Sequence, residues 1–401
     1  MPHPVSTFRE QPKSASVAGD AIVITGLGMV SPIGGDVVSS CAAARAGLTQ
    51  WTELDLQVTD EHTLEAVSLK GHEIPWLTLG FEGFARWLRL GDAALRDLVA
   101  YSGLTRADYA QTGFLLQLPG SFINDIHLKT SLLERLPENE RARIQREIDA
   151  ERTEARNSLT RRLIPELLAL NNIRIEPQAQ SYAFGGAAAS CQLLLRAIEG
   201  LRSRTMDRCI IGGIDSWVDG EPLTQAFDLG LLRTPNRPIG RFPGEAGAFI
   251  LLERIDAARS RGARIEGLLG PVAFTSDTSH RFSGQAPSGK ALFKAIEACF
   301  PGGARQATDV ELLIANLNGD EQRAREFGHC LVHLKEAELP SSTPRWHVPE
   351  HFGEIGAATS TVATCLAVRG FARGYARSRK ALVALLDDEP SRGAFLLQAH
   401  S

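Results

Sequence analysis

The sequence predicts an α/β fold in which largely parallel, buried sheets alternate with helices. Apolar runs rich in β-branched residues alternate with helical stretches along the chain, which is typical of βα units. Two such βα-rich halves, 21–254 and 265–400, follow one another and suggest an internal duplication, although no literal repeat is visible. Apolar residues make up 43% of the 401-residue chain and charged residues 22%, the composition of a globular protein with a large core.

The N-terminal half, 21–255, begins with a buried strand and contains one highly charged segment. The β-branched run AIVITGLG (21–28) ends in glycines, and the helical DVVSSCAAARAGL (36–48) follows it. The segment 134–162 holds 7 acidic and 8 basic residues, with opposite charges three or four positions apart, and predicts a solvated helix that projects from the body. The other elements expected here are a polar stretch (52–75), a helix (82–104), an apolar run (113–120), an extended stretch (173–177), a turn (183–190), a helix (191–204) and strands (209–216, 244–254).

The C-terminal half, 256–401, shows the same alternation. Its apolar runs are short and bounded by glycine, proline or charged residues, which favours strands over long helices. We expect, in order, a strand (265–274), a helix (289–300), a strand (310–319), a helix (321–337), a glycine-rich turn (352–360), a helix (361–376) and two strands (380–388, 393–400).

Charge and hydropathy exclude several classes of protein. The chain carries 43 Lys+Arg and 47 Asp+Glu, a net charge of −4, which argues against a nucleic-acid partner bound on a basic surface. No apolar run approaches the roughly 18 residues of a membrane span, and residues 1–20 lack a signal-peptide core. We therefore expect a cytoplasmic protein with no membrane partner and a disordered leader at 1–20. Its six scattered cysteines, with no CxxC pair, are interpreted as reduced core thiols.

Two glycine-rich segments resemble phosphate-binding loops only in part. GLGMVS (26–31) has two of the three glycines of a dinucleotide loop, but Ser31 takes the third position and Pro32 follows at once. GQAPSGKA (284–291) lacks the magnesium-binding hydroxyl because Ala291 stands in its place. We therefore predict no nucleotide cofactor at either segment.

Four histidines have the spacing of paired metal ligands. His329 and His333 are one helical turn apart, and His347 and His351 share that spacing. Pro349 breaks the second pair as a helix, and no cysteine or carboxylate has a matching spacing. We expect no metal.

Three stretches, VITGLGMVSPIGGDV (23–37), AAASCQLLLRAIEGLRSRTMDRCIIGGIDS (187–216) and RFPGEAGAFILLERIDAARSRGARI (241–265), together carry a resemblance to a known family. The chain resembles the β-ketoacyl synthases of the thiolase superfamily from 21 to 400. The resemblance implies a thiolase-like, five-layered αβαβα fold made of two pseudo-duplicated halves, and commonly a homodimer.

In that family a cysteine at the N-terminus of a buried helix attacks an acyl thioester, and two histidines stabilise the carbanion formed on decarboxylation. Carried onto this sequence, the nucleophile position falls on Ala187, and the first histidine position falls on Asn316 within ANLNG. The second falls on Gly353 within HFGEIGAAT, with Glu354 as the nearest polar residue. The family's Gly-Phe-Gly-Gly gating loop is matched by DDEPSR (387–392).

The resemblance therefore implies a site without catalytic residues. A methyl group cannot attack a thioester, and an asparagine cannot act as an acid or base near neutral pH. Cys191 lies about 6 Å further along the helix and begins the apolar face CQLLL, so we expect it to point into the core. His351 is two residues from the second histidine position, and a shifted loop would bring it back.

Three hypotheses about function remain open. The preferred one is a non-catalytic protein-binding scaffold, adaptor or chaperone, in a homodimer or heterodimer, with 134–162 as a grip for the partner or as a cap over the vacated pocket. The resemblance supplies two precedents: cysteine-lacking partner subunits of polyketide synthases, and thiolase-like proteins encoded beside bacterial type VI secretion genes. The second hypothesis is altered chemistry, a decarboxylase or hydrolase that uses Asn316 and Glu354. The third is a pocket that binds an acyl chain or acyl carrier protein without reaction.

Overall fold

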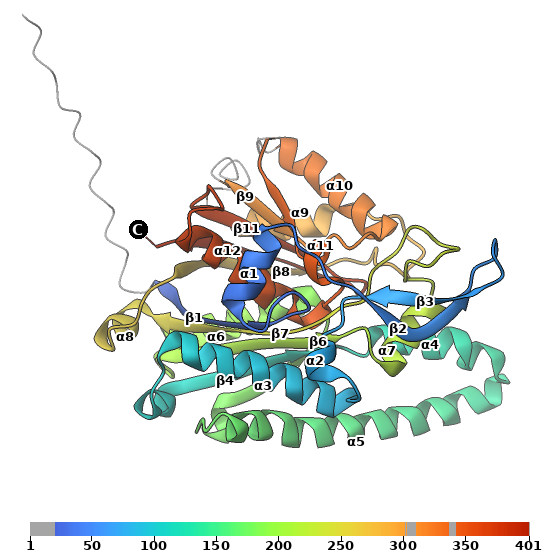
Figure 1. The fold of residues 1–401 in the computed structure, drawn as a ribbon, viewed down its shortest axis with the longest axis horizontal. Coiled ribbons are helices and arrows are strands. Elements are labelled where there is room, and N and C mark those ends of the chain that lie inside the picture. Colours follow the sequence, from blue (N-terminus) through green and yellow to red (C-terminus); the bar gives the residue numbers. More distant parts are fainter. Residues whose placement is uncertain (1–20, 301, 303–309, 337–341, 401) are drawn as a thin grey trace, which may run out of the picture.

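Two half-sheets joined edge to edge form the frame of the molecule (Figure 1). The computed structural model describes residues 21–300, 302, 310–336 and 342–400; the expected leader, 1–20, lies outside them. Within these residues the first half-sheet has the order β5-β4-β6-β7-β1 and the second β10-β9-β11-β12-β8, joined by short pairing of β1 with β8. The strands are β1 (Ile22–Val30), β4 (Thr112–Leu118), β5 (Gln180–Phe184), β6 (Arg208–Ser216), β7 (Glu245–Arg254), β8 (Gly267–Ser276), β9 (Leu312–Ala315), β10 (Arg345–His347), β11 (Lys380–Leu386) and β12 (Ser391–Ala399).

The two half-sheets have the same topology, which confirms the expected duplication of the fold. In each half the second strand in sequence lies between the third and the fourth and pairs with both in parallel. The fifth strand pairs antiparallel with the fourth and with the first. The repeat therefore lies mainly in strand order and direction, and little of it is visible in the sequence.

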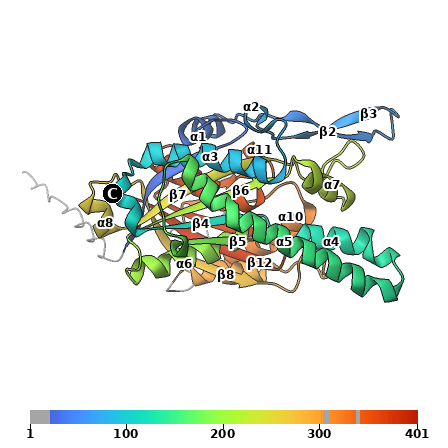
Figure 2. The same cartoon turned by 90° about the horizontal axis from the view of Figure 1, so that it is seen from below.

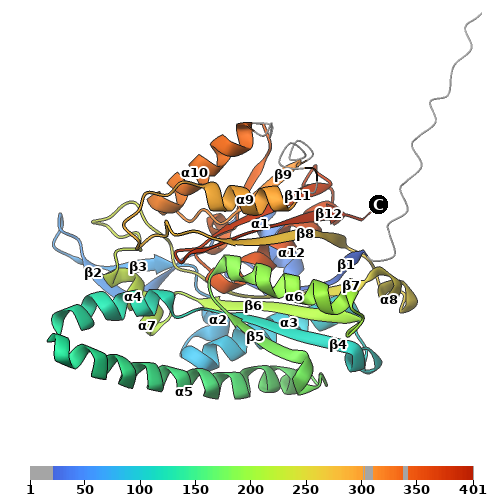
Figure 3. The same ribbon diagram turned by 180° about the vertical axis from the view of Figure 1, so that it is seen from behind.

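Helices and half-sheets stack in five layers, as expected (Figure 3). Helices α3 (Gly83–Ser102) and α5 (Glu138–Leu170) cover the outer face of the first half-sheet. Helices α6 (Ser190–Arg202) and α12 (Thr359–Ala372) lie between the half-sheets, and α9 (Lys290–Ala298) and α10 (Glu321–Glu336) cover the outer face of the second. Side chains alternate between layers along a strand: Phe114 and Leu116 enter the outer core, whereas Leu115 enters the central one.

One helix of the central layer is buried on all sides. In α12 every residue from Thr359 to Gly370 is buried, because the helix is enclosed by both half-sheets. Cys191 in α6 is fully buried in the same core, as expected for the start of an apolar face. All six cysteines are buried and unpaired.

A helical hairpin and a β-hairpin extend from this body. The charged segment forms most of α5, which is antiparallel to α4 (Phe122–Ser131) and reaches well beyond the sheet (Figure 2). The buried residues of α5 all lie in its last third, between Leu163 and Leu168, so the charged part is solvated. The polar stretch contains a hairpin of β2 (Thr52–Thr59) and β3 (Ala66–Gly71). The remaining helices are α1 (Val37–Arg45), α2 (Pro75–Thr78), α7 (Gly220–Asp228), α8 (Ile255–Ser260) and α11 (Pro349–Phe352).

Two expectations differ from the structure. The sheet is mixed and not largely parallel, since the pairs β1–β7, β1–β8, β6–β7, β8–β12 and β11–β12 are antiparallel. The connection from β11 to β12 is too short for a crossover, so these strands form a hairpin.

The second difference is one misplaced element. The extended stretch at 173–177 is not a strand: Pro177 begins a 3₁₀ turn, and the edge strand β5 starts at Gln180. Proline has no N–H to donate to a ladder and its fixed φ suits the first position of a helical turn, so the strand starts after it.

Candidate functional site

The four positions carried over from the family meet at the centre of the molecule, where strand ends and helix starts converge. Strands β9 and β11 are parallel neighbours, so their carboxyl ends lie side by side. Asn316 follows β9, and the turn 387–390 follows β11 and passes over the start of α6. The 3₁₀ turns that precede α6 and α12, 187–189 and 356–358, pack against one another here.

At the nucleophile position the helix start is occupied by carboxylates. Ala187 is 1% exposed and presents only a methyl group. The N–H of Ala188 donates to Oδ2 of Asp387 at 3.0 Å, and the N–H of Gly186 donates to Oε1 of Glu389 at 2.8 Å. In an acyl-transfer enzyme such N–H groups stabilise a thiolate or an oxyanion. Here they already bond the protein's own acids.

Asn316 serves as a structural bridge. Its side-chain N–H group donates to the carbonyl oxygen of Leu386 at 2.8 Å, and its carbonyl oxygen accepts from the N–H of Leu386 at 3.0 Å. The side chain thereby extends the β9–β11 pairing by one step beyond the strand. It is 1% exposed, and both ends of the amide are occupied.

At Gly353 the backbone is shaped for a residue without a side chain. Its φ is +72° and its ψ is −168°, a region that only glycine adopts readily. A Cβ there would lie 2.8 Å from the His72 ring, 2.9 Å from the Pro243 carbonyl oxygen and 3.0 Å from that of Phe242. A histidine side chain at this position would be strained and crowded.

Glu354 is held in a buried ion pair. Its Oε2 lies 3.0 Å from Nη1 of Arg323 and also accepts from the amide of Asn318, while Oε1 accepts from the N–H of Gly356 at 3.1 Å. Arg323 also donates to the carbonyl oxygen of Asn316 at 3.1 Å. Because both carboxylate oxygens have partners, Glu354 is not placed as a free base.

The pair is part of a larger ion-pair network that fills the centre. Arg241, 0% exposed, binds Asp388 through both terminal nitrogens, one of them at 2.5 Å. Arg323 approaches Asp388 at 3.7 Å, and Arg241 approaches Asp320 at the same distance. The network consists of Arg241, Arg281 and Arg323 with Asp320, Glu354 and Asp388, three positive and three negative groups.

The acids at this centre have divergent pKa values. Burial alone would raise the pKa of Asp388, but the Arg241 and Arg323 guanidiniums outweigh it and hold that pKa well below its usual range. Burial and the neighbouring Glu389 raise the pKa of Asp387 well above the usual value. Burial raises the pKa of Asp215 to about 7, against the bond that its carboxylate accepts from the N–H of Ala357.

Comparisons with known proteins agree with this architecture. No family model matches the chain. Two proteins named polyketide beta-ketoacyl synthase 1, from Streptomyces cyaneus and Streptomyces halstedii, are each 29% identical over 182 residues, 40% of this chain and 42% of the relative. The chain thus matches less than half the length of these relatives.

The similarity to solved structures extends over nearly the whole chain. A type II polyketide synthase ketosynthase structure with its acyl carrier protein covers 95% of this chain and 99% of its own, with TM-score 0.67 and 14% identity. The ishigamide ketosynthase/chain length factor gives 0.68 and 17% with the same coverage. A ketosynthase from the bacillaene synthase of Bacillus subtilis 168 gives 0.68 and 12%, over 95% and 72%. The chain has the thiolase-like fold of these ketosynthases.

In this thiolase-like protein the other candidate residues lie away from the centre or are closed off. His351 bonds the carbonyl oxygen of Leu48 at 3.2 Å, so the loop shift that would have made it a catalytic histidine does not occur. His329 bonds the Pro287 carbonyl oxygen at 2.7 Å, and His333 packs on Phe293. Within the described residues no three ligand-type side chains gather at a metal-binding distance.

Among the described residues, no helix is long and apolar enough to cross a bilayer.

The residues that sequence reasoning missed are the central arginines and aspartates. Asp320 and Asp388 each follow a strand end closely, at Ala315 and Leu386, and adjacent parallel strands place such residues together. The position of these aspartates after two neighbouring strands was the sequence signal that could have identified them.

Proposed function

We propose that this protein is a non-catalytic, ketosynthase-like scaffold that binds a protein partner in the cytoplasm. The observation that carries the proposal is the start of α6, where a methyl group stands at the nucleophile position and the adjacent N–H groups bond Asp387 and Glu389. A thioester carbonyl would meet no nucleophile there and would face acidic side chains. The two family histidine positions hold a bridging amide and a glycine.

The partner that we propose is a ketosynthase-type subunit or an acyl carrier protein. Support comes from the solved structures of similar fold, which include a ketosynthase/chain length factor and a ketosynthase in complex with its acyl carrier protein. None of the relatives reported above is a type VI secretion protein, so we do not propose that association.

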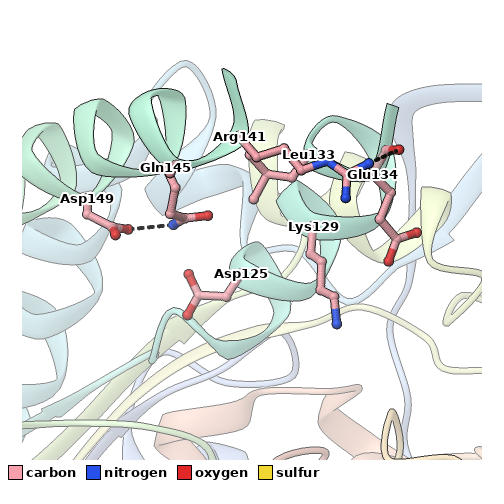
Figure 4. Close-up of a pocket in the computed structure, with 8 residues that line it drawn as sticks. Asp125, Lys129, Leu133, Glu134, Arg141, Gln145 and Asp149 are labelled. Atoms are coloured by element: carbon pink, nitrogen blue, oxygen red, sulfur yellow. Dashed lines mark hydrogen bonds between the residues drawn. The ribbon is translucent and has the colours of Figure 1, made fainter. Parts of the chain in front are cut away.

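The α4–α5 hairpin is the surface that we assign to the partner. It is anchored to the body by His127 of α4, whose Nε2 lies 2.8 Å from Asp228 of α7. An open cleft of about 610 Å³ lies between the two helices. Lys129 and Glu134 line one side of it, and Gln145 and Asp149 line the other (Figure 4). Charges of both signs along a projecting helix give a partner specific ion-pair and hydrogen-bond sites.

Two experiments test the two parts of this proposal. First, the protein is incubated with acetyl- and malonyl-coenzyme A and its intact mass is recorded; we expect no covalent acyl adduct and no release of carbon dioxide above buffer. Second, it is mixed with a purified type II ketosynthase or its acyl carrier protein, and complex formation is followed by size exclusion with light scattering. An acyl adduct overturns the non-catalytic part.

The hairpin is tested by a variant in which 122–152 is replaced by a short Gly-Ser linker. The ends of this segment lie close together, because Arg152 reaches Asp125 at 2.5 Å across the two helices. The buried residues Leu163 to Leu168 stay in place. We expect the deletion to abolish the complex while the control variant Arg202→Ala, exposed at the end of α6 and outside the hairpin, retains it. Undiminished binding by the deletion removes the role of the hairpin.

One observation favours a second candidate, a hydrolase or decarboxylase. The raised pKa of Asp387 is the kind of perturbation found in acid–base catalysts, and this residue lies beside the nucleophile position. The expectation for this candidate is turnover of malonyl or acetoacetyl thioesters that Asp387→Asn abolishes and Glu354→Gln leaves intact.

A further inference from the structure

A second cavity, separate from the central site, lies between α1, the segment from β10 to α11, and the end of α12. Its volume is about 540 Å³, within the range of small-molecule pockets. Its apolar part is formed by Cys41, Ala44 and Leu366, all buried. Two of the histidines with metal-like spacing, His347 and His351, line it as well.

The charge of this cavity is positive. Arg45, Arg373 and Arg377 line it, and none of the three has a carboxylate within ion-pair distance among the described residues. Glu350 is the one acid among the described lining residues. Guanidinium groups without an acidic partner attract anions, and their planar fork fits a phosphate or carboxylate through two parallel hydrogen bonds.

The cavity also presents aromatic rings. Trp346 and Tyr375 stack with centroids 6.1 Å apart and an interplanar angle of 26°, and the Arg45 guanidinium lies 4.9 Å from the Tyr375 ring centroid. A flat ligand can extend such a stack, because ring faces and guanidinium planes tolerate many planar partners.

Two buried polar atoms on these residues lack a hydrogen-bond partner within the described part of the protein, Oη of Tyr375 and Nδ1 of His347. Burial lowers the pKa of His347, so its ring is neutral near pH 7 and one of its nitrogens can accept a hydrogen bond. Buried polar atoms in proteins are almost always satisfied. Neither atom faces the open space of the cavity, however, so the case for a ligand rests on the arginines and the rings.

We propose that this cavity binds a small planar anion, an aromatic ring that carries a phosphate or a carboxylate. The ring lies against Trp346 and the apolar floor, and the anionic group meets Arg45, Arg373 and Arg377. This site does not depend on the proposed scaffold function, because it shares no residue with the central network.

Isothermal titration of the full chain with four probes tests the proposal. 1-Naphthyl phosphate and 1-naphthoate carry the ring with either anion and so distinguish the two headgroups; 1-naphthol carries the ring alone, and inorganic phosphate the anion alone. We expect saturable 1:1 binding of at least one naphthyl anion. The affinities for naphthol and for phosphate should be lower by a factor of about ten or more. Absence of saturable binding by both naphthyl anions, or equal binding of naphthol, overturns the proposal.

Variants assign the binding to this cavity. Arg45→Gln and Arg373→Gln should each weaken the bound anion about ten-fold, whereas Arg345→Gln, on β10 but outside the cavity lining, should change it less than about two-fold. Tyr375→Phe keeps the ring and removes a buried hydroxyl that does not face the cavity, so it should leave the melting temperature unchanged or higher and the affinity within about two-fold. Equal affinities across the cavity variants and Arg345→Gln would place the anion elsewhere and refute the assignment.

Discussion

Placing a cysteine at position 187 tests whether the surroundings of that position would keep a thiol unreactive. In Ala187→Cys the thiol would be buried, since Ala187 is 1% exposed. The helix start that would lower its pKa is already bonded to Asp387 and Glu389. We therefore expect a thiol that stays protonated and does not react.

The chain's own thiols set the magnitude. Burial raises the pKa of Cys41, Cys299 and Cys330 to about 12 in each case. An ordinary thiol with a pKa of about 8.5 is roughly 3% thiolate at pH 7, whereas one with a pKa of about 12 is roughly 0.001% thiolate. Since the thiolate is the nucleophile, the introduced cysteine should react about three thousand times more slowly than an exposed one.

The assay is intact mass spectrometry after timed exposure to iodoacetamide or to acetyl-coenzyme A at pH 7. Ser158→Cys, on the exposed face of α5, is the reactive control, and the unmodified chain with six buried cysteines is the blank. The double variant Ala187→Cys/Asp387→Asn should react faster than the single variant. If Ala187→Cys is labelled within about ten-fold of Ser158→Cys, the carboxylates do not suppress the site and the reasoning fails.

Three further variants probe the rebuilt centre. Gly353→Ala should lower the free energy of unfolding, measured with urea, by about 3 kcal/mol, because the φ of this residue is positive and two carbonyl oxygens lie close to the added Cβ. The control Gly328→Ala, whose Cβ would contact nothing, should be neutral or stabilising. Equal effects of the two variants would contradict the strained backbone at Gly353. Arg241→Met should cost about 3–5 kcal/mol in the same measurement, since it leaves Asp388 buried without its main partner; a loss under about 1 kcal/mol would refute the role of this pair. Asp215 holds its proton up to about pH 7 in the folded state but releases it near pH 3.8 in the unfolded state. Between these values the free energy of unfolding should therefore fall as the pH rises, by on the order of 4 kcal/mol in total. Asp215→Asn should remove this pH dependence, and an unchanged dependence would contradict the raised pKa.

The layers of the fold could be predicted from sequence because they depend on local patterns. The apolar runs 209–216 and 380–388 predicted buried strands, and both are strands within one or two residues of the expected bounds. The error at 173–177 arose where Ile173 and Ile175 alternate as in a strand although Pro177 starts a turn. The position of Ala187 at the start of a buried helix also followed from sequence.

The chemistry of the centre could not be predicted in the same way. The network joins Arg241, Asp320, Glu354 and Asp388 from four separate segments, and ion pairs leave no periodic pattern in a sequence. Sequence reasoning treated Glu354 as an unpaired acid in the pocket, because its partner Arg323 lies 31 residues away. A closer comparison of GAAAS (186–190) with GAATS (356–360) would have exposed the duplication at its most informative point.

That duplication explains how the two halves are held together at the centre. Asp215 is in β6, at its carboxyl end, and Asp387 follows β11, the equivalent strand of the other half. Asp387 accepts from the second residue of the turn before α6, and Asp215 accepts from the second residue of the turn before α12. Each half therefore caps the central helix of the other with a buried acid. The backbone N–H groups at the start of each central helix thus bond to an acid from the other half, and these bonds link the two half-sheets.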